Sequence, residues 1–187
     1  MRALALLAHV EEADRVHHGY VLGIGSNMEP EKNVPRIVGQ LISEFGRILI
    51  SRFYETAPVG MHTDGLFINF CVFVRTAFEP AACKAACANI EVKLGRDRTH
   101  PCRKTRDRAA DIDILARLYV DGSRIQLQET ADYLAESAAE IYAILSPGRP
   151  VPVARGHVRT LAVGKLQLGH APTAVDRDDR TGLVVVG

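Results

Sequence analysis

One stretch of the sequence restricts the possible folds more than any other. Residues 66–76, LFINFCVFVRT, are almost wholly apolar, and Gly65 and polar residues bound them. A short run of this kind, rich in aromatic and β-branched residues, is typical of a strand buried on both faces. The stretch therefore predicts the central strand of a sheet.

Strand patterns also occur on either side of this segment. Residues 19–25 are short, partly β-branched and closed by glycine, and residues 47–56 alternate and are rich in β-forming residues. Residues 109–120 form a further such run, which ends at Asp121-Gly122. Each of these stretches predicts a strand, and the run at 47–56 predicts a single one.

Two other stretches have the features of helices. Between residues 27 and 46 apolar side chains recur at positions 37, 38, 41, 42 and 45, with Gly46 as a natural stop and Pro35 expected in the first turn. Residues 80–95 begin with Pro80 and end with Gly95, as helices often do. Both stretches predict helices.

Taken in order, these elements predict a β-α-β-β-α-β chain. This is the order of ferredoxin-like folds, an α/β (α+β) class with a four-stranded antiparallel sheet and both helices on one face. Residues 19–120 are expected to form this core, after an N-terminal extension at 1–18. Residues 121–187 are expected to add a C-terminal helix, at 130–145, and strands that pack on the same domain.

Charge and cysteine content narrow the function classes. A net charge of +1 argues against non-specific nucleic-acid binding. The N-terminal residues do not match a signal peptide, and no stretch approaches the length of a membrane span. The four cysteines lack zinc-ligand spacing, so buried or free thiols are expected. We expect a cytoplasmic protein, monomeric or dimeric, with no membrane and no nucleic-acid partner.

Two carboxylates, Asp111 and Asp113, alternate with isoleucines in the last predicted strand. Alternate side chains of a strand share a face, so both carboxylates point the same way. They repel each other unless solvent or a divalent cation separates them. Mg²⁺ is often held by such carboxylates together with substrate phosphates. The motif alone, however, more often marks a solvent-facing strand.

A basic stretch, GRDRTHPCRKTRDR, precedes the two aspartates. Its cationic residues are Arg96, Arg98, Arg103, Lys104, Arg106 and Arg108. Arginine binds phosphate oxygens in a bidentate manner. A solvated loop would explain the basic run by itself. Beside paired carboxylates, however, it predicts a site for phosphoryl transfer, which depends mainly on positioning and charge neutralisation.

Phe67 and Asn69 share one face of the central strand. A phenylalanine ring offers a stacking surface for a flat ligand, and an amide can bind the edge of a heterocycle. A core phenylalanine beside a backbone-bonded asparagine is the simpler alternative, although asparagine is depleted in strand interiors. The preceding loop, TAPVG at 56–60, is placed to close such a pocket.

These motifs together resemble the 6-hydroxymethyl-7,8-dihydropterin pyrophosphokinase family of folate biosynthesis. The family shows G-S-N, Y-x-T-x-P-x-G, F-x-N, I-E-x-x-x-G-R-x-R and D-x-D-I-L motifs. All occur here in that order: LGIGSNMEPEKN at 22–33, FYETAPVG at 53–60, LFINFCV at 66–72, IEVKLGRDR at 90–98 and RAADIDIL at 108–115. The resemblance covers about residues 20–118 and agrees with the predicted ferredoxin-like fold.

The resemblance implies an enzyme, a 2-amino-4-hydroxy-6-hydroxymethyldihydropteridine diphosphokinase. It would transfer pyrophosphate from ATP to 6-hydroxymethyl-7,8-dihydropterin and release AMP, with two Mg²⁺ ions as cofactors. By position, the resemblance implies Asp111 and Asp113 as metal ligands and Arg96 and Arg108 as catalytic residues. The implied ATP-binding residues are Glu91, Arg98 and Ile114. The implied pterin-binding residues are Thr56, Ala57, Val59, Phe67 and Asn69.

The chain also departs from the family pattern. It has no tryptophan, although the family has one in the mobile loop before the acidic strand, and that loop is about two residues longer here. Ala88 replaces the glutamine expected three residues before Glu91, and a V-P-H segment has no clear counterpart. Tyr133 and Tyr142 are the candidates for a second aromatic that stacks on the pterin.

Three alternatives remain open at the level of the sequence. The chain could be a divergent paralogue that uses another pterin, or a pterin- or nucleotide-binding protein without catalysis. An RNA-binding module shares the β-α-β-β-α-β order, but LFINFCVFV lacks the R/K-G-F/Y-G/A-F core of that class. Paired aspartates and a net charge near zero also fit RNA binding poorly.

Overall fold

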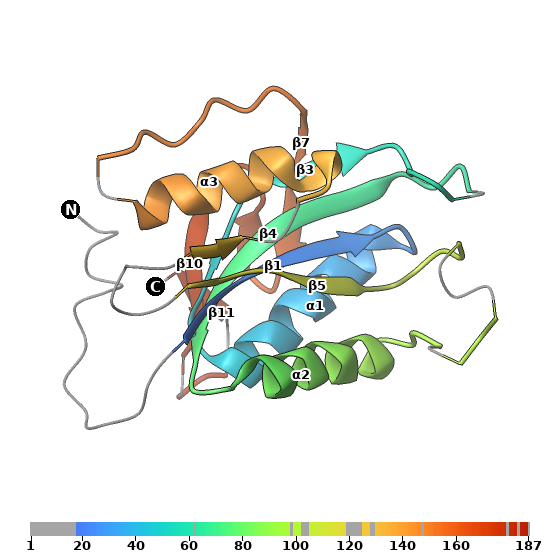
Figure 1. The fold of residues 1–187 in the computed structure, drawn as a ribbon, viewed down its shortest axis with the longest axis horizontal. Helices are drawn as coiled ribbons and strands as arrows, with labels where there is room; N and C mark the ends of the chain where they lie inside the picture. The colour runs from blue at the N-terminus through green and yellow to red at the C-terminus, as the bar shows by residue number, and fades with distance from the viewer. Residues whose placement is uncertain are drawn as a thin grey trace.

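The computed structural model has one large antiparallel sheet covered on both faces by helices (Figure 1). It describes residues 18–61, 63–97, 99–101, 105–118, 125–127, 130–146, 148–178, 180–182 and 184–186. Nine strands of this described part form the sheet, with the main order β11-β10-β2-β4-β1-β5-β6. The predicted N-terminal extension at 1–18 lies outside the described residues except for His18.

The centre of the sheet consists of four strands and follows the predicted order. These are β1 (His18–Ser26), β2 (Ile48–Ile50), β4 (Phe67–Thr76) and β5 (Asp111–Leu118). β4 pairs with β1 along nine residue pairs, and β1 pairs with β5 on its other side, all antiparallel. The apolar stretch at 66–76 is therefore a central strand, as predicted, and the α/β fold of ferredoxin-like type is confirmed.

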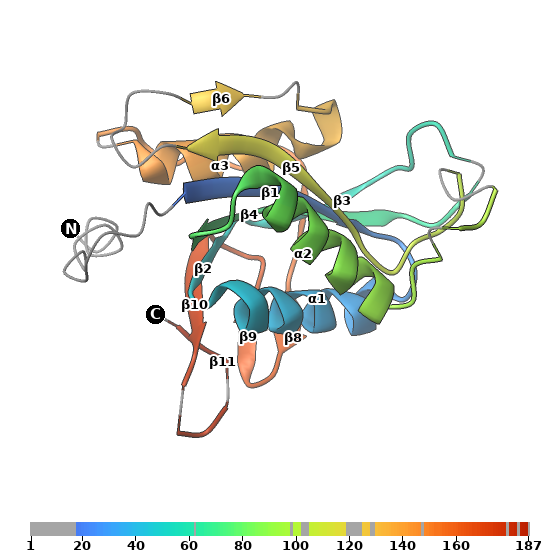
Figure 2. The ribbon, with the colours of Figure 1, turned by 60° about the horizontal axis from the view of Figure 1, so that its bottom comes forward.

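The two predicted helices, α1 (Pro30–Phe45) and α2 (Pro80–Lys93), lie together on one face of the sheet (Figure 2). Their apolar side chains pack against Leu22, Ile24 and Phe70 in the larger of two buried clusters. A third helix, α3 (Ala135–Leu145), follows the 3-10 turn η2 (Asp132–Leu134) and covers the opposite face. This face of the sheet contributes Val21, Phe73 and Leu115 to the second cluster.

The prediction of a single strand at 47–56 was wrong. The structure has β2 and then β3 (Phe53–Thr56), with Ser51 and Arg52 between them. Ile50 pairs with Val72 of β4, and Tyr54 pairs with Asn69 of β4. Between these two pairs the chain advances four residues from β2 to β3 but only three along β4. This extra residue bends the strand in the manner of a β-bulge. The hydroxyl of Ser51 accepts the backbone N–H of Cys71 at 2.9 Å.

The position expected for Pro35 was also wrong, because α1 begins five residues earlier. Pro30 occupies the first turn, and Pro35 lies inside the helix. The preceding residue, Glu29, has a left-handed backbone conformation with φ 40°. Its carbonyl accepts the N–H groups of Lys32 and Asn33, both at 2.9 Å. The helix is therefore already established before Pro35, which removes one N–H donor from an otherwise continuous helix.

The C-terminal part adds strands around this centre. They are β6 (Ile125–Leu127), β7 (His157–Arg159), β8 (Leu161–Val163), β9 (Leu166–Leu168), β10 (Thr173–Arg177) and β11 (Val184–Val186). β6, β7, β10 and β11 extend the sheet, whereas β8 and β9 form a separate hairpin. Leu161, Val163 and Leu168 of this hairpin belong to the buried cluster beneath α1.

Two further expectations concern thiols and membranes. Cys71, Cys83 and Cys87 are buried free thiols, as predicted, whereas Cys102 lies outside the described residues. None of the helices in the described ranges has the length and apolar character that crossing a membrane requires.

Candidate active site

A hollow opens where β1 has glycines at alternate positions. Gly25 pairs with Asp111 of β5 on one side and with Asn69 of β4 on the other, and Gly23 pairs with Asp113. Directly opposed residues of an antiparallel pair point to the same face of a sheet. Because glycine has no side chain, the floor between the aspartates and Asn69 is left open.

Side chains around the hollow come so close to both glycines that a larger residue at either position would displace them. A Cβ atom on Gly25 would lie 2.8 Å from Oδ1 of Asn69 and 3.3 Å from Cδ1 of Phe67. A Cβ atom on Gly23 would lie 2.6 Å from Cδ1 of Leu134. The two glycines therefore allow Asn69, Phe67 and η2 to approach the sheet closely.

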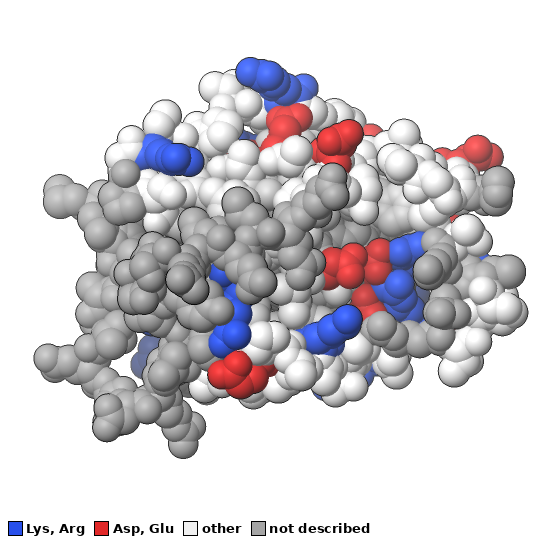
Figure 3. Space-filling view, viewed as in Figure 1, with Lys and Arg blue, Asp and Glu red and all other residues white. Residues whose placement is uncertain are grey.

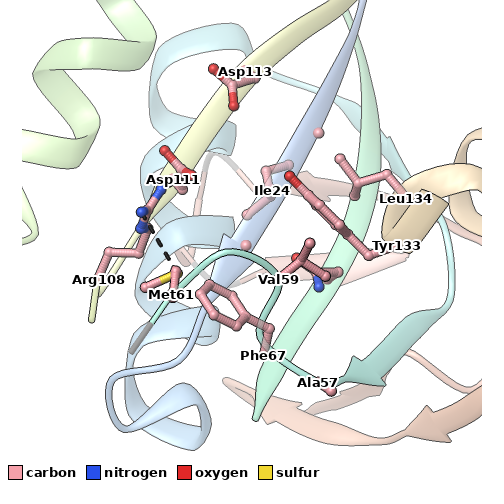
Figure 4. A pocket seen from close by; sticks show the side chains of 13 residues that line it. Ile24, Ala57, Val59, Met61, Phe67, Arg108, Asp111, Asp113, Tyr133 and Leu134 are labelled. Atoms are coloured by element: carbon pink, nitrogen blue, oxygen red, sulfur yellow. Dashed lines mark hydrogen bonds and ion pairs between the residues drawn. The ribbon is translucent and has the colours of Figure 1, made fainter. Parts of the chain in front are cut away.

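The first cavity above this floor has a volume of about 190 Å³. Its lining includes Phe67 and Asn69 from β4, Ala57, Val59 and Met61 from the loop after β3, and Arg108, Asp111 and Asp113. Phe67 and Tyr133 reach into it from β4 and η2 (Figure 4). The cavity thus combines aromatic surfaces with one amide and two carboxylates.

The amide of Asn69 is fixed within this cavity. Its Nδ2 donates to Oγ1 of Thr56 at 2.7 Å, and the residue is only 3% exposed. Thr56 itself is absent from the cavity lining, so its contribution is to orient Asn69. With Nδ2 engaged, Oδ1 of Asn69 lies over Gly25 at the cavity floor.

A second, larger hollow runs along β5 beside α2. This groove has a volume of about 680 Å³, and its lining includes Lys84, Glu91, Arg96, Ile114, Arg117 and Tyr133. Asp111 and Asp113 line both hollows, so the carboxylate pair lies at their boundary. Figure 3 shows acidic side chains directly beside basic ones on this face of the molecule. Two ligands that occupied the two hollows would therefore meet at the aspartates.

Two arginines hold the carboxylate of Asp111. Nη1 of Arg96 donates to Oδ1 of Asp111 and, at 2.6 Å, to Oε1 of Glu91, and Nη1 of Arg108 donates to Oδ2 of Asp111. Burial is the largest influence on Arg96 and opposes its charge, but the bond to Asp111 together with the negative charges of Asp111, Glu91 and Asp113 raises the pKa of this guanidinium. Each oxygen of Asp111 therefore faces a cation.

The other carboxylate has a different environment. Asp113 is partly exposed to solvent and accepts no hydrogen bond from the side chains and backbone groups that the structure describes. Partial burial raises its pKa, the negative charge of Asp111 adds to this effect, and Arg96, Arg108 and Lys84 oppose it. Asp113 is thus the carboxylate of the pair with oxygens available to a ligand.

The residue before β5 is positioned by Asn27 of the G-S-N motif. Oδ1 of Asn27 accepts the N–H of Arg108 at 2.8 Å, and its own N–H donates to the carbonyl of Arg108 at 3.1 Å. Its Nδ2 donates to Asp107 at 2.6 Å. These bonds fix the backbone of Arg108 next to the end of β1. Through Asn27, the loop after β1 therefore positions a residue that lines the cavity.

The donor set around Asp111 and Asp113 is compatible with Mg²⁺. Within the described ranges there is no cluster of three or more His, Cys, Asp or Glu residues that could hold a metal ion. Two carboxylates are enough for Mg²⁺, which keeps water ligands and takes substrate phosphates as further ligands. Both carboxylates supply the hard oxygen atoms that this ion prefers, and Asp113 supplies them without a competing cation bond.

The structure brings together most of the residues that the sequence singled out. Ala57, Val59, Phe67, Asn69 and Arg108 line the cavity, whereas Glu91, Arg96 and Ile114 line the groove. Arg98 lies outside the described residues. Of the two candidate aromatics, Tyr133 lines both hollows, whereas Tyr142 packs against the cluster beneath α3.

The sequence did not single out several other residues of the site. They are Gly23, Met61, Lys84, Arg117 and Leu134. Lys84 precedes Glu91 by seven residues in a predicted helix, and this two-turn spacing could have indicated the shared face. No local pattern marks Met61 or Leu134, which reach the cavity because the chain folds back on itself.

Comparison with known proteins points to a single family. A family model described as 7,8-dihydro-6-hydroxymethylpterin-pyrophosphokinase (HPPK) matches residues 21–145. A 2-amino-4-hydroxy-6-hydroxymethyldihydropteridine pyrophosphokinase of Porphyromonas gingivalis is 33% identical over 96 residues, or 50% of this chain and 65% of that relative. A protein of the same name from Bacillus subtilis is 29% identical over 97 residues, 50% of this chain and 56% of its own length. The matches thus span less than two thirds of either relative.

Proposed function

The chain belongs to the 7,8-dihydro-6-hydroxymethylpterin-pyrophosphokinase family, and on this premise we propose that it transfers pyrophosphate from ATP to 6-hydroxymethyl-7,8-dihydropterin. The hydroxymethyl oxygen attacks the β-phosphorus, and the bond from this phosphorus to the oxygen bridging it to the α-phosphate breaks. AMP leaves with that oxygen, and the hydroxyl proton is released. The product belongs to folate or related pterin biosynthesis.

One observation carries the proposal: Asp111 and Asp113 lie at the boundary of two hollows. A transfer between two substrates requires that the reacting atoms meet at one point, close to groups that neutralise phosphate charge. The carboxylate pair and the two arginines beside it occupy that point. Bound Mg²⁺ would reduce the repulsion between the incoming oxygen and the polyphosphate, and Asp111 and Asp113 are the residues that would hold it.

The smaller cavity suits the pterin. Phe67 offers a face for stacking, and the buried amide of Asn69 offers its carbonyl oxygen to a donor on the heterocycle edge. Ala57 and Val59 line the loop side of the cavity, and Val59 is 70% exposed. An apolar side chain this exposed becomes buried if a flat ligand occupies the cavity, which favours binding. We assign the second aromatic face to Tyr133.

The groove along β5 suits the nucleotide. The N–H of Ile112 points away from β1, because it donates to Oε1 of Glu91 at 2.8 Å. Along a strand, the backbone N–H and C=O groups of every second residue point to the same side. Those of Ile114, two residues after Ile112, therefore also point away from β1 and into the groove. These groups are placed to bind the edge of a base, and Arg98 remains a proposed phosphate ligand by position.

The arginines have two sets of partners in this mechanism. In the structure, Arg96 and Arg108 pair with Asp111 and neutralise its charge. A polyphosphate offers them more negative charge and bidentate acceptors, so their guanidinium groups can transfer from Asp111 to phosphate oxygens. This exchange would release the oxygens of Asp111 for Mg²⁺ at the moment when the nucleotide binds.

The proposal is tested by AMP release from ATP in the presence of Mg²⁺ and 6-hydroxymethyl-7,8-dihydropterin. AMP should form only when the pterin is present, and Asp111→Ala should abolish it while circular dichroism shows retained folding. Folded protein that forms no AMP with any hydroxymethylpterin would exclude catalysis. If calorimetry then still detects binding of pterin or nucleotide, the chain is a binding protein instead.

A further inference from the structure

One cation of the nucleotide groove has no place in the mechanism described so far. Lys84 lies on the exposed side of α2 and lines the groove together with Cys87, Ala88 and Glu91. Positions 84, 87, 88 and 91 are spaced by three and four residues, so they form one stripe along the helix. Lys84 is the cationic residue of this stripe, and Ala88, one turn later, contributes no polar side-chain group.

Among the cations near Asp113, Lys84 differs from the two arginines in its bonding partners. Three cations act electrostatically on this carboxylate, namely Arg96, Arg108 and Lys84. Arg96 and Arg108 are both bonded to Asp111, and Arg96 also to Glu91. Lys84, by contrast, forms no ion pair or hydrogen bond with any group in the described part of the chain. Its charge is therefore available to an anionic ligand.

The position of Lys84 indicates which anion this is. The groove runs along β5 from Asp111 to Arg117, and Lys84 faces it from the α2 side. Asp113 lies at the end where the groove meets the pterin cavity. A nucleotide whose reacting phosphate is at the aspartates would extend its α-phosphate and ribose into the groove, past Lys84.

We propose that Lys84 binds the α-phosphate of the nucleotide and so recognises the nucleoside monophosphate that leaves. This inference rests on the proposed function, because it assigns a phosphate to the groove. Breaking the bond to the β-phosphorus leaves negative charge on the α-phosphate, and a nearby ammonium group attracts that charge. Lysine acts on phosphate as a compact point charge with three rotatable donors, which suits a site at the solvent edge.

The test compares nucleotides that differ only in their phosphates. Binding of AMP, ATP and adenosine is measured by calorimetry for the wild type, Lys84→Met, Lys84→Arg and Lys93→Met. Lys93 is an exposed lysine of the same helix that does not line the groove, which makes it the matched control. Methionine keeps the unbranched apolar chain and the helix propensity while removing the charge.

Lys84→Met should weaken the binding of AMP and of ATP about tenfold, which is the size expected for one charge-assisted hydrogen bond. The affinity for adenosine should change by less than about twofold. Lys84→Arg should retain most of the affinity, and Lys93→Met should match the wild type. Unchanged AMP affinity in Lys84→Met would overturn the inference, and so would an equal loss for adenosine, because that would indicate packing against the base or ribose.

Failure of this inference can be distinguished from failure of the proposed function. AMP release from ATP by the wild type is measured in parallel. If the wild type releases AMP but Lys84→Met binds AMP normally, only the role of Lys84 is wrong. If AMP binding depends on Lys84 but no AMP forms with any hydroxymethylpterin, the phosphate site stands and catalysis is excluded.

Discussion

Glu91 accepts the backbone N–H of Ile112 at 2.8 Å, and this bond joins α2 to β5 directly between the two aspartates. The same oxygen, Oε1, accepts Nη1 of Arg96 at 2.6 Å. Glu91 is 2% exposed, so its carboxylate is buried but paired. One buried side chain thereby ties α2 to the strand that carries Asp111 and Asp113.

Replacing Glu91 by alanine should destabilise the protein. The N–H of Ile112 would lose its acceptor in a buried position, and Arg96 would lose one of its two carboxylate partners. We expect a loss of about 3 kcal/mol in the free energy of unfolding, measured with urea. Glu91→Gln keeps an acceptor oxygen and should lose clearly less. Equal losses in both variants would show that the charge of Glu91, rather than its backbone bond, stabilises the fold.

Asp113→Asn should remove activity without loss of stability. Asp113 accepts no hydrogen bond within the described residues, and its pKa is raised by partial burial and by Asp111, so its negative charge does not stabilise the fold. The melting temperature should therefore stay equal or rise. AMP release should fall about 100-fold or more, as is typical when one electrostatic group of a catalytic site is removed. A stable variant with normal turnover would exclude Asp113 as a metal ligand.

Gly25→Ala should impair pterin binding while leaving the fold intact. The added Cβ would meet Oδ1 of Asn69 at 2.8 Å and Phe67 at 3.3 Å, so both side chains must move from the cavity floor. We expect at least about tenfold weaker pterin binding by calorimetry, the equivalent of about 1.4 kcal/mol.

Gly39→Ala is the matched control for this substitution. Gly39 lies inside α1, and a Cβ atom built there meets no atom within 4 Å apart from its chain neighbours and the adjacent backbone of its own helix. Because alanine favours helices over glycine by about 0.5–1 kcal/mol, this variant should be slightly more stable and should bind pterin normally. Normal pterin affinity in Gly25→Ala would contradict the close fit inferred for the cavity floor.

Alkaline pH should reveal the buried pair of Tyr54 and Glu140. The hydroxyl of Tyr54 donates to Oε1 of Glu140 at 2.5 Å, and burial followed by this bond raises the pKa of Tyr54 above its usual value. The phenol is deprotonated near pH 10 in the unfolded chain but keeps its proton in the fold. This contribution to stability is therefore complete below about pH 10 and is lost as the pH rises above it.

This expectation is tested by urea unfolding at about pH 8 and at about pH 10.5, which lie on either side of the ordinary tyrosine pKa near 10. Tyr54→Phe should be less stable than the wild type at the lower pH, because Glu140 loses one donor. It should also lose less stability between the two pH values. An identical loss in both proteins would show that Tyr54 does not titrate differently in the folded and unfolded states.

Local patterns accounted for the elements of the core and for part of the site. The bounding residues Pro80 and Gly95 identified α2. Helical spacing identified α1 and the apolar run identified β4, because the period of buried residues follows the geometry of each element. The same alternation placed Asp111 and Asp113 on one face. It did not reveal the break at Ser51 and Arg52, which arises from pairing with β4 rather than from residues nearby in the chain.

The sequence by itself determined the order of strands and helices, the paired carboxylates and the family motifs, all of which lie within short segments. Only the tertiary structure decided that Asp111 and Asp113 separate two hollows, that Tyr133 rather than Tyr142 reaches the smaller cavity, and that Lys84 faces the groove along β5. The physical reason is that these relations depend on strand register and on packing between elements. Such contacts join residues far apart in the chain, and no local period encodes them.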